Sequence, residues 1–85
     1  MSELLSFPTW FPIKIMGTCS DDFAQSIARV VIRHAPDFDP GTMEMRASAH
    51  RRYLSLTCTI HATSRDQLDE LYRELTAHPG VKVVL

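Results

Sequence analysis

Apolar and polar residues alternate along four short segments of the chain, and this period of two is typical of half-buried β-strands. The segments are residues 11–17, 43–47, 53–62 and 81–85. The alternation is clearest in the third segment, whose alternate apolar positions are Leu54, Leu56, Cys58 and Ile60. The last segment alternates Val81, Val83 and Leu85 with Lys82 and Val84. We therefore expect four strands, with the apolar side of the third facing the core.

Two further segments repeat apolar residues at spacings of three and four, which predicts amphipathic helices. The first, of about 15 residues, carries Phe23, Ile27, Val30, Val31 and His34 and follows Ser20-Asp21-Asp22, a hydroxyl cap with two acids for the positive end of the helix dipole. The second carries Leu68, Leu71, Tyr72 and Leu75. Ser64 with Gln67 fits a capping box at its start, and Thr63 with Asp66 fits nearly as well. Residues 36–41 and His78-Pro79-Gly80 end the two helices.

The order of elements is strand, helix, strand, strand, helix, strand. Right-handed crossovers turn this order into a ferredoxin-like α+β fold, a four-stranded antiparallel sheet with both helices on one face. At 85 residues the chain is long enough for one domain, residues 1–85, with residues 1–10 as an extended N-terminal segment. The other face of the sheet stays open. It is expected to carry Lys14, Met16, Tyr53, Ser55, Thr57, Thr59 and His61, with Glu44 and Arg46 from the second strand.

Composition narrows the classes of partner. Nine Lys and Arg residues against ten Asp and Glu give a formal charge of −1, which argues against nucleic acid or a membrane surface as partner. No apolar run approaches the ~20 residues of a membrane-spanning helix, and Glu3 lies where a secretory signal would carry a base. We therefore expect a cytoplasmic protein whose Cys19 and Cys58 are reduced thiols.

The sequence holds no pattern that indicates an enzyme, a cofactor or a metal. A soft metal ion in the loop after the first strand would need a second thiolate near Cys19, and Asp22 stands at the expected position. The four histidines lack the spacing of a zinc site, and we interpret His34 and His78 as caps of terminal helix carbonyls. His61, on the open face, is the better functional candidate. A Gly-rich phosphate loop and a nucleophilic serine turn are also missing.

Several stretches along the whole chain resemble the YbeD-like family of small bacterial proteins. They include Phe7-Pro8, Lys14-Ile15-Met16-Gly17, Arg33-His34-Ala35-Pro36, Tyr53-Leu54-Ser55 and Val81-Lys82-Val83-Val84-Leu85. The resemblance implies a ferredoxin-like fold related to ACT-like regulatory domains, a cytoplasmic bacterial protein with no established activity, and a link to lipoate synthesis, since members are often encoded near its octanoyltransferase. The chain departs from the family pattern at Ser48-Ala49-His50-Arg51-Arg52, where a Gly is expected shortly before Tyr53.

Two functions remain open. The first is a regulatory or adaptor protein that binds a protein partner, or a second copy of itself, through the open face. The second is an ACT-like sensor of an amino acid or related carboxylate. Its ligand site would be the loop of Gly17, Thr18, Cys19 and Ser20, where Gly17 allows close approach and the helix start offers N–H groups. RNA binding is disfavoured, because Tyr53 is the only aromatic ring besides His61 on the outward side of the third strand.

The N-terminal segment is unusually apolar for a tail, with Leu4, Leu5, Phe7, Pro8, Trp10 and Phe11. Pro8 and Pro12 keep it extended. One interpretation is that it lies across the sheet edge or against a partner. The other, which we favour, is that it caps the small core.

Overall fold

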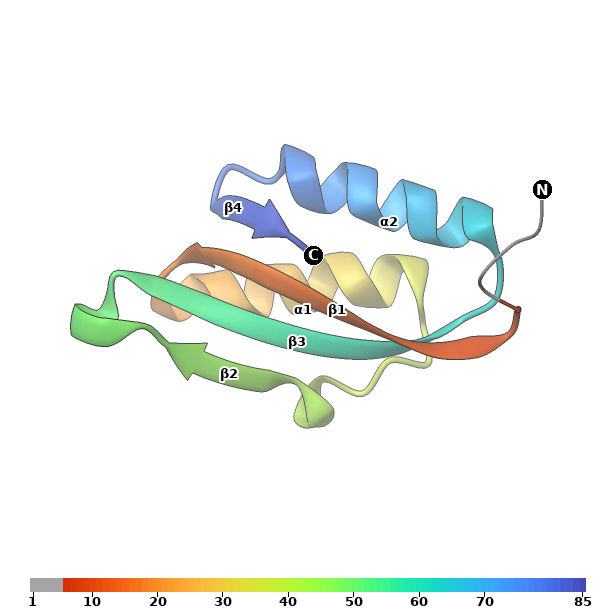
Figure 1. Cartoon of the computed structure of the whole chain (residues 1–85), viewed down its shortest axis with the longest axis horizontal. Coiled ribbons are helices and arrows are strands. Elements are labelled where there is room, and N and C mark those ends of the chain that lie inside the picture. The colour runs from red at the N-terminus through yellow and green to blue at the C-terminus, as the bar shows by residue number, and fades with distance from the viewer. Residues whose placement is uncertain (1–5) are drawn as a thin grey trace.

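Each segment with a period of two forms a strand, and each segment with the helical period forms a helix. The computed structural model describes residues 6–85 and contains β1 (Thr9–Thr18), α1 (Asp21–His34), β2 (Glu44–Ala47), β3 (Tyr53–Ala62), α2 (Arg65–Ala77) and β4 (Val81–Val84). Short 3-10 turns at Pro40–Thr42 and Ala49–Arg51 flank β2. The sheet is antiparallel in the order β2-β3-β1-β4, and both helices cover the same face (Figure 1). The ferredoxin-like prediction is confirmed.

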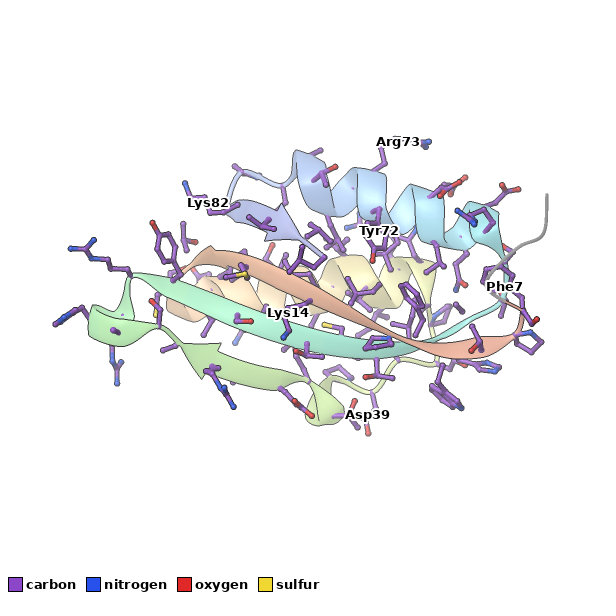
Figure 2. The ribbon with its side chains drawn as sticks, viewed as in Figure 1. Phe7, Lys14, Asp39, Tyr72, Arg73 and Lys82 are labelled. Atoms are coloured by element: carbon purple, nitrogen blue, oxygen red, sulfur yellow. The ribbon has the colours of Figure 1, made fainter. Side chains whose placement is uncertain are left out.

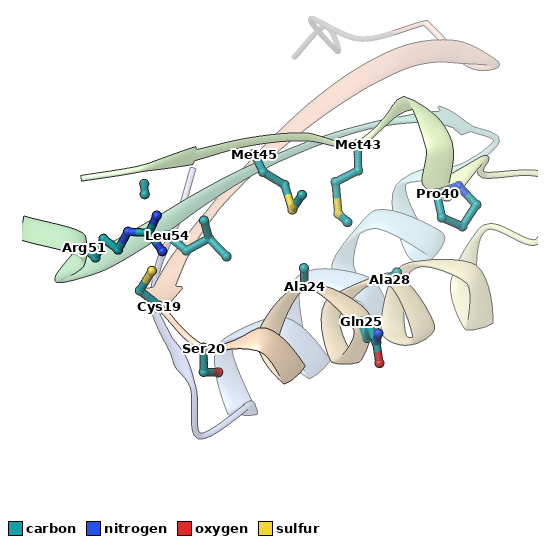
Figure 3. A pocket seen from close by; sticks show the side chains of 11 residues that line it. Cys19, Ser20, Ala24, Gln25, Ala28, Pro40, Met43, Met45, Arg51 and Leu54 are labelled. Carbon is teal, nitrogen blue, oxygen red and sulfur yellow. The ribbon is translucent and has the colours of Figure 1, made fainter. Parts of the chain in front are cut away.

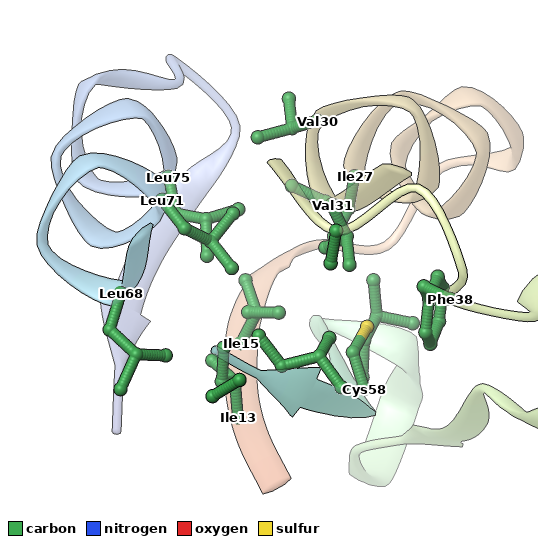
Figure 4. Packing of buried hydrophobic residues seen from close by; sticks show 14 of the residues in the cluster. Ile13, Ile15, Ile27, Val30, Val31, Phe38, Cys58, Leu68, Leu71 and Leu75 are labelled. Atoms are coloured by element: carbon green, nitrogen blue, oxygen red, sulfur yellow. The ribbon is translucent and has the colours of Figure 1, made fainter. Parts of the chain in front are cut away.

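The long central pair, β1 with β3, decides which side chains face the helices. Ile13 lies opposite Cys58 and Ile15 opposite Leu56, and residues directly opposite each other share one side of an antiparallel sheet. All four are fully buried, as are Ile27 and Val31 of α1 and Leu71 and Leu75 of α2 (Figure 4). Full burial of such a side chain stabilises the fold by roughly 1.5–3 kcal/mol. The apolar side of the third predicted strand therefore forms the centre of the core.

The two helix starts differ in their caps. Ser64 accepts a hydrogen bond from the Gln67 N–H at 3.1 Å, and the Gln67 side-chain oxygen accepts one from the Thr63 N–H at 2.7 Å. The Ser64 and Gln67 capping box is confirmed, with the glutamine reaching one residue further back than in the standard motif. Ser20 is the N-cap residue of α1, but its side chain makes no capping hydrogen bond. The predicted hydroxyl cap of α1 is therefore wrong, although the helix begins where expected.

Polar side chains tie the two antiparallel helices together end to end. The Gln67 amide donates to the backbone oxygen of His34 at 2.8 Å, and the His34 ring bonds Glu74 at 2.7 Å. At the other end, His78 Nδ1 accepts from the Gly80 N–H at 2.9 Å, so its Nε2 carries the proton donated to Ser26 Oγ at 2.6 Å. The histidines do not cap carbonyls as predicted. Their rings bridge α1 to α2 because both helices pack on the same face.

Gly17 lies within β1, whereas the sequence placed it at the end of the first strand, where the loop to the helix begins. It is buried, and a Cβ atom there would overlap the Gly80 carbonyl oxygen and the Phe23 ring. The glycine serves close packing of β1, β4 and α1, which the sequence pattern did not distinguish from a turn.

The pairing of β1 with β4 shifts register between Met16 and Gly17. Because of this irregularity Val81 and Val84 both pack against the core, while Val83 and Leu85 are exposed. The expectation that Val81, Val83 and Leu85 share one side is wrong for this reason.

The N-terminal segment joins the sheet earlier than predicted, because β1 begins at Thr9. Phe7 packs partly buried against the core, as the cap interpretation expects, whereas Trp10 points away from it. The expected positions of Leu4 and Leu5 fall outside the described residues. In residues 6–85 neither helix has the length and hydropathy needed to cross a membrane.

Candidate functional site

The open face of the sheet gathers all seven residues predicted for it. Lys14 lies opposite Thr57, Met16 opposite Ser55, and Thr57 in turn opposite Glu44 of β2. By the same register Tyr53, Thr59 and His61 lie on this side, and Arg46 lies beside Ser55. Figure 2 shows Lys14 on this face, seen from its open side. The sheet thus presents a polar centre to the solvent.

Four residues that the sequence did not assign also lie on the open face. Trp10 lies opposite His61, Pro12 opposite Thr59, Val83 opposite Met16 and Leu85 opposite Lys14. Trp10 is 68% exposed and Leu85 65%. Extending the parity of Lys14 and Met16 back along the chain through Pro12 would have found Trp10. No signal in the sequence revealed Val83 and Leu85, because the register shift in β4 determines their direction.

The end of the open face near the start of β1 holds an aromatic and acidic group. The rings of Trp10 and His61 lie 4.9 Å apart between centroids with an interplanar angle of 44°. His61 Nδ1 lies 3.8 Å from a carboxylate oxygen of Asp37, in the loop after α1. The tilted contact with the His61 ring leaves most of the indole in solvent. Such a half-fixed, exposed tryptophan is suited to contact with another molecule.

The middle of the open face is a shallow polar hollow of about 220 Å³. It is lined by Lys14, Glu44, Met45, Arg46, Ser55 and Thr57. Charges of both signs and hydroxyls surround it, so it offers hydrogen bonds and no strong field of one sign. This surface can donate hydrogen bonds to polar groups and accept hydrogen bonds from them.

The four residues predicted for a ligand loop do not form one site. Gly17 is covered by Phe23 and Gly80, and Thr18 is exposed at the end of the open face, opposite Tyr53. Cys19 and Ser20 line a different feature, a groove of about 690 Å³ between α1 and β2. Only half of the predicted loop therefore faces a common cavity.

The groove between α1 and β2 is mostly apolar. Figure 3 shows Met43 and Met45 pointing toward Ala24 and Ala28 of α1, with Cys19, Leu54 and Arg51 at one end and Pro40 at the other. It exists because α1 and α2 cover β1, β3 and β4, so that every residue of β2 remains exposed. A groove with methionines along it and one guanidinium at its end fits a small molecule with an apolar body and a carboxylate.

Arg51 reaches the groove from a backbone that is unfavourable for its side chain. His50 and Arg51 have φ angles of 60° and 55°, in the left-handed region, and neither is glycine. This is the stretch where the family pattern led us to expect a glycine. Residues held in this region cost of order 1–3 kcal/mol each and recur at functional sites. Where the family pattern expects a glycine, this chain therefore has a strained turn that places the Arg51 guanidinium beside the groove.

Burial raises the pKa of two side chains of the described residues, Cys58 and Tyr72. Burial raises the pKa of the Cys58 thiol to about 12, so it stays protonated and unreactive in the core. Partial burial also raises the pKa of Tyr72. Within residues 6–85 no cluster of three or more His, Cys, Asp or Glu side chains is placed to hold a metal ion.

Comparison with known proteins places the chain in a family. The family model described as "Protein of unknown function (DUF493)" matches residues 2–85. A UPF0250 protein of Ralstonia nicotianae is 56% identical over 98% of this chain and 86% of its own length. Another UPF0250 protein, of Nitrosomonas europaea, is 54% identical over 98% of this chain and 95% of its own.

Two solved structures share the fold. The C-terminal domain of the MgtC protein from Mycobacterium tuberculosis superposes with a TM-score of 0.66 at 14% identity, over 96% of this chain and 89% of that one. The ACT domain of a GTP pyrophosphokinase from Chlorobium tepidum superposes with a TM-score of 0.61 at 23% identity, over 91% and 97%. At these identities the likeness concerns the fold alone. The relatives confirm the YbeD-like resemblance, and the chain belongs to the bacterial DUF493 family of UPF0250 proteins, with an ACT-like ferredoxin fold.

Proposed function

We propose that this protein is a non-catalytic regulator or adaptor of the bacterial cytoplasm, which binds a protein partner through the open face of its sheet. The observation that carries the proposal is the uncovered face, on which Trp10 is exposed and contacts the His61 ring in a tilted arrangement. Binding energy in protein interfaces concentrates in a few residues, with tryptophan and tyrosine enriched among them. Tyr53 and Leu85 add exposed apolar area elsewhere on the same face.

The charge of the face favours a protein over a nucleic acid. Lys14 and Arg46 are accompanied by Glu44 in the polar hollow, and Asp37 lies beside His61. Binding to a polyanion depends on many uncompensated cations, which this face does not supply. A protein partner that presents an apolar ridge, hydrogen-bond donors and hydrogen-bond acceptors complements this face better.

The experiment compares capture of partners from a bacterial lysate by the wild-type protein and by two face variants, W10A and T59E. Thr59 is exposed on β3, opposite Pro12. We expect both variants to lose the same captured protein, because one removes the aromatic anchor and the other puts a charge in the interface. Direct titration of the purified partner should then show at least a tenfold loss of affinity, the size of effect typical of an interface hot spot.

A matched control makes the same threonine-to-glutamate substitution as T59E, but on the opposite side of the molecule. T76E places the same charge on an exposed position of α2, on the layer opposite the open face. It should retain the partner, and circular dichroism should show all three variants folded. Equal capture by W10A, T59E and wild type would contradict the proposal.

The second candidate function is a sensor of a small carboxylate, and the groove at Arg51 is the observation that favours it. The ligand would place its apolar part along Met43 and Met45 and its carboxylate on the guanidinium. A bound ligand stabilises the folded state, and the stabilisation grows with the ratio of ligand concentration to dissociation constant. Binding is therefore detected as a rise in melting temperature. Amino acids and short fatty acids are the probes, and octanoate among them tests the lipoate link implied by the family resemblance.

The R51G variant separates binding from stability. Glycine accepts the positive φ at this position, so we expect the variant to be as stable as wild type or more stable. It should lose any melting shift caused by a carboxylate, whereas R52A, a neighbouring arginine outside the groove lining, should keep it. The sensor function is excluded if none of the probes shifts the wild-type melting temperature.

A further inference from the structure

The outer edge of β2 is a free sheet edge. β2 ends the strand order, so no strand within residues 6–85 lies beyond it. The Ser48 N–H donates to the Tyr53 oxygen at 2.8 Å, and hydrogen-bonded pairs recur at every second residue of an antiparallel ladder. The even-numbered residues of β2 therefore direct their backbone groups at β3. Met45 and Ala47 direct theirs outward, where another strand can bond to them.

The side chains of β2 separate by chemistry between its two sides. Glu44 and Arg46 lie on the open face, opposite Thr57 and Ser55. On the groove side lie Met45, which is 61% exposed, and Ala47. This side of β2 therefore offers apolar contact along its whole length.

The charges on β2 differ from those that guard sheet edges against association. Guarded edges commonly carry lysine or proline. β4, at the other edge, fits that description, because Lys82 is the only charged residue of Val81–Val84. β2 instead carries an acid and a base two residues apart. Such a pair attracts a strand with the same sequence running in the opposite direction.

We infer that this edge pairs with β2 of a second copy of the chain, antiparallel, with Met45 opposite Met45 of that copy. A twofold-symmetric antiparallel pair must place outward-directed residues opposite each other, which allows a centre at any of the four residues of β2. The Met45 centre places Glu44 of each copy opposite Arg46 of the other. The Glu44 centre opposes two carboxylates and the Arg46 centre opposes two guanidinium groups. The Ala47 centre leaves both charges without a complement.

The same register also matches the apolar side. Each Met45 N–H donates to the Met45 oxygen of the other copy, and each Ala47 N–H donates to the Met43 oxygen. The Met43 N–H already bonds the Pro40 oxygen at 3.1 Å, which leaves its carbonyl as the group to be used. Met45 packs on its counterpart and Ala47 on Met43, so the groove-side apolar residues become covered. The two sheets then continue as one.

This interface is a second surface, beyond the docking face of the proposed function. The docking face of the proposed function lies on β1 and β3, where Trp10 pairs with His61 and Pro12 with Thr59. These positions lie beyond the part of β3 that pairs with β2. A short edge buries less area than a standard interface, so we expect a weak dimer that forms between about 10 µM and 1 mM. Self-association and partner binding can therefore be lost separately.

Sedimentation equilibrium over that concentration range tests the inference with charge reversals. E44R alone and R46E alone each place like charges in both cross-strand pairs and should weaken the dimer about tenfold or more. The double variant E44R/R46E restores both pairs and should restore the dimer. An equimolar mixture of the two single variants should form a mixed dimer, since one chain is then basic at both positions and the other acidic.

The possible results distinguish this dimer from the docking face. A wild-type chain that stays monomeric at about 1 mM overturns the inference, as does a dimer that both single reversals leave unchanged. A dimer lost in W10A or T59E but kept in E44R would move the contact to the open face and also overturn it. Loss in the single reversals, rescue in the double variant and the mixture, and retention in W10A would establish the β2 interface, whatever the lysate experiment shows.

Discussion

Single residues in this chain carry roles that their type alone does not reveal, and Gly17 is the clearest case. A glycine after an apolar alternation and before a helix cap reads as a turn. In the structure its missing side chain makes room for the Phe23 ring of α1 and for the Gly80 carbonyl, in the turn before β4. These contacts join positions far apart in the sequence. A pattern local to β1 therefore could not distinguish packing from a turn.

We expect Gly17→Ala to destabilise the fold by about 1–3 kcal/mol, the usual range for overpacking a filled core. The Cβ atom would meet a backbone carbonyl, which cannot move without disturbing the β1–β4 pairing. Urea unfolding followed by circular dichroism measures the change. Gly41→Ala is the matched control, because the nearest atom to a Cβ there is an exposed Asp39 oxygen at 3.2 Å; it should change stability by less than about 0.5 kcal/mol. Equal stability of the two variants would refute this role of Gly17.

At the scale of elements, local patterns predicted the helices and strands well and their polar contacts poorly. Ser20 and Ser64 look alike in sequence, because each is a serine with an acid within the next two residues and an amphipathic run after it. Only Ser64 makes the cap, with Gln67 three residues later. Phe23 stands three residues after Ser20, where a capping box needs Glu or Gln. The capping box is local and was predicted. The bridges between the helices depend on which helices become neighbours, which no local pattern contains.

Glu74 joins the two helices through both of its oxygens. It accepts a hydrogen bond from His34 at 2.7 Å and lies 2.8 Å from the Arg33 guanidinium. The His34 hydrogen bond and the nearby positive charges lower the pKa of Glu74 below its ordinary value of 4.5. A carboxyl with a lowered pKa in the folded state binds its proton less readily than in the unfolded chain. Its contribution to stability is therefore present above pH 4.5 and is lost as the pH falls through the lowered pKa.

We therefore expect wild type to lose stability more steeply than Glu74→Gln as the pH falls below 4.5. At neutral pH the variant should be the less stable of the two, and the difference should shrink with acid. Urea unfolding at a series of pH values measures both curves. Glu70→Gln, at an exposed position of the same helix, serves as the control and should follow the wild-type slope. Parallel curves for wild type and Glu74→Gln would show that the bridge does not depend on the charge.

At the scale of the whole molecule, the buried side chains of residues 6–85 form one core, which β1, β3 and both helices build without β2. Every residue of β2 is exposed, whereas the central strands and the two helices supply the fully buried side chains. The sequence predicted this division in part, since residues 43–47 alternate only weakly. It could not predict that the helices leave the groove side of β2 uncovered. That gap, and the free edge beside it, are the features on which the groove and the β2 interface depend.

Cys58 lies at the centre of this core, opposite Ile13, while Cys19 is partly exposed beside the groove. Because two strands and two helices share the core, exposing Cys58 requires the sheet to separate from the helices. Detachment of β2 alone would leave Cys58 buried, since Cys58 pairs with Ile13 of β1 and not with β2. With Cys19 replaced in a C19S variant, we expect an aromatic disulfide reagent at pH 8 to leave Cys58 unmodified in the folded protein, since burial both excludes the reagent and raises the thiol pKa to about 12. With increasing urea, Cys58 should become labelled at the same midpoint at which the helical circular dichroism signal disappears, as a cooperative single core demands.

The complementary C58A variant should be labelled at Cys19 without denaturant. Prompt labelling of Cys58 in native buffer, or at a urea concentration well below the circular dichroism midpoint, would mean that the sheet opens without the helices and that the core is not one cooperative unit.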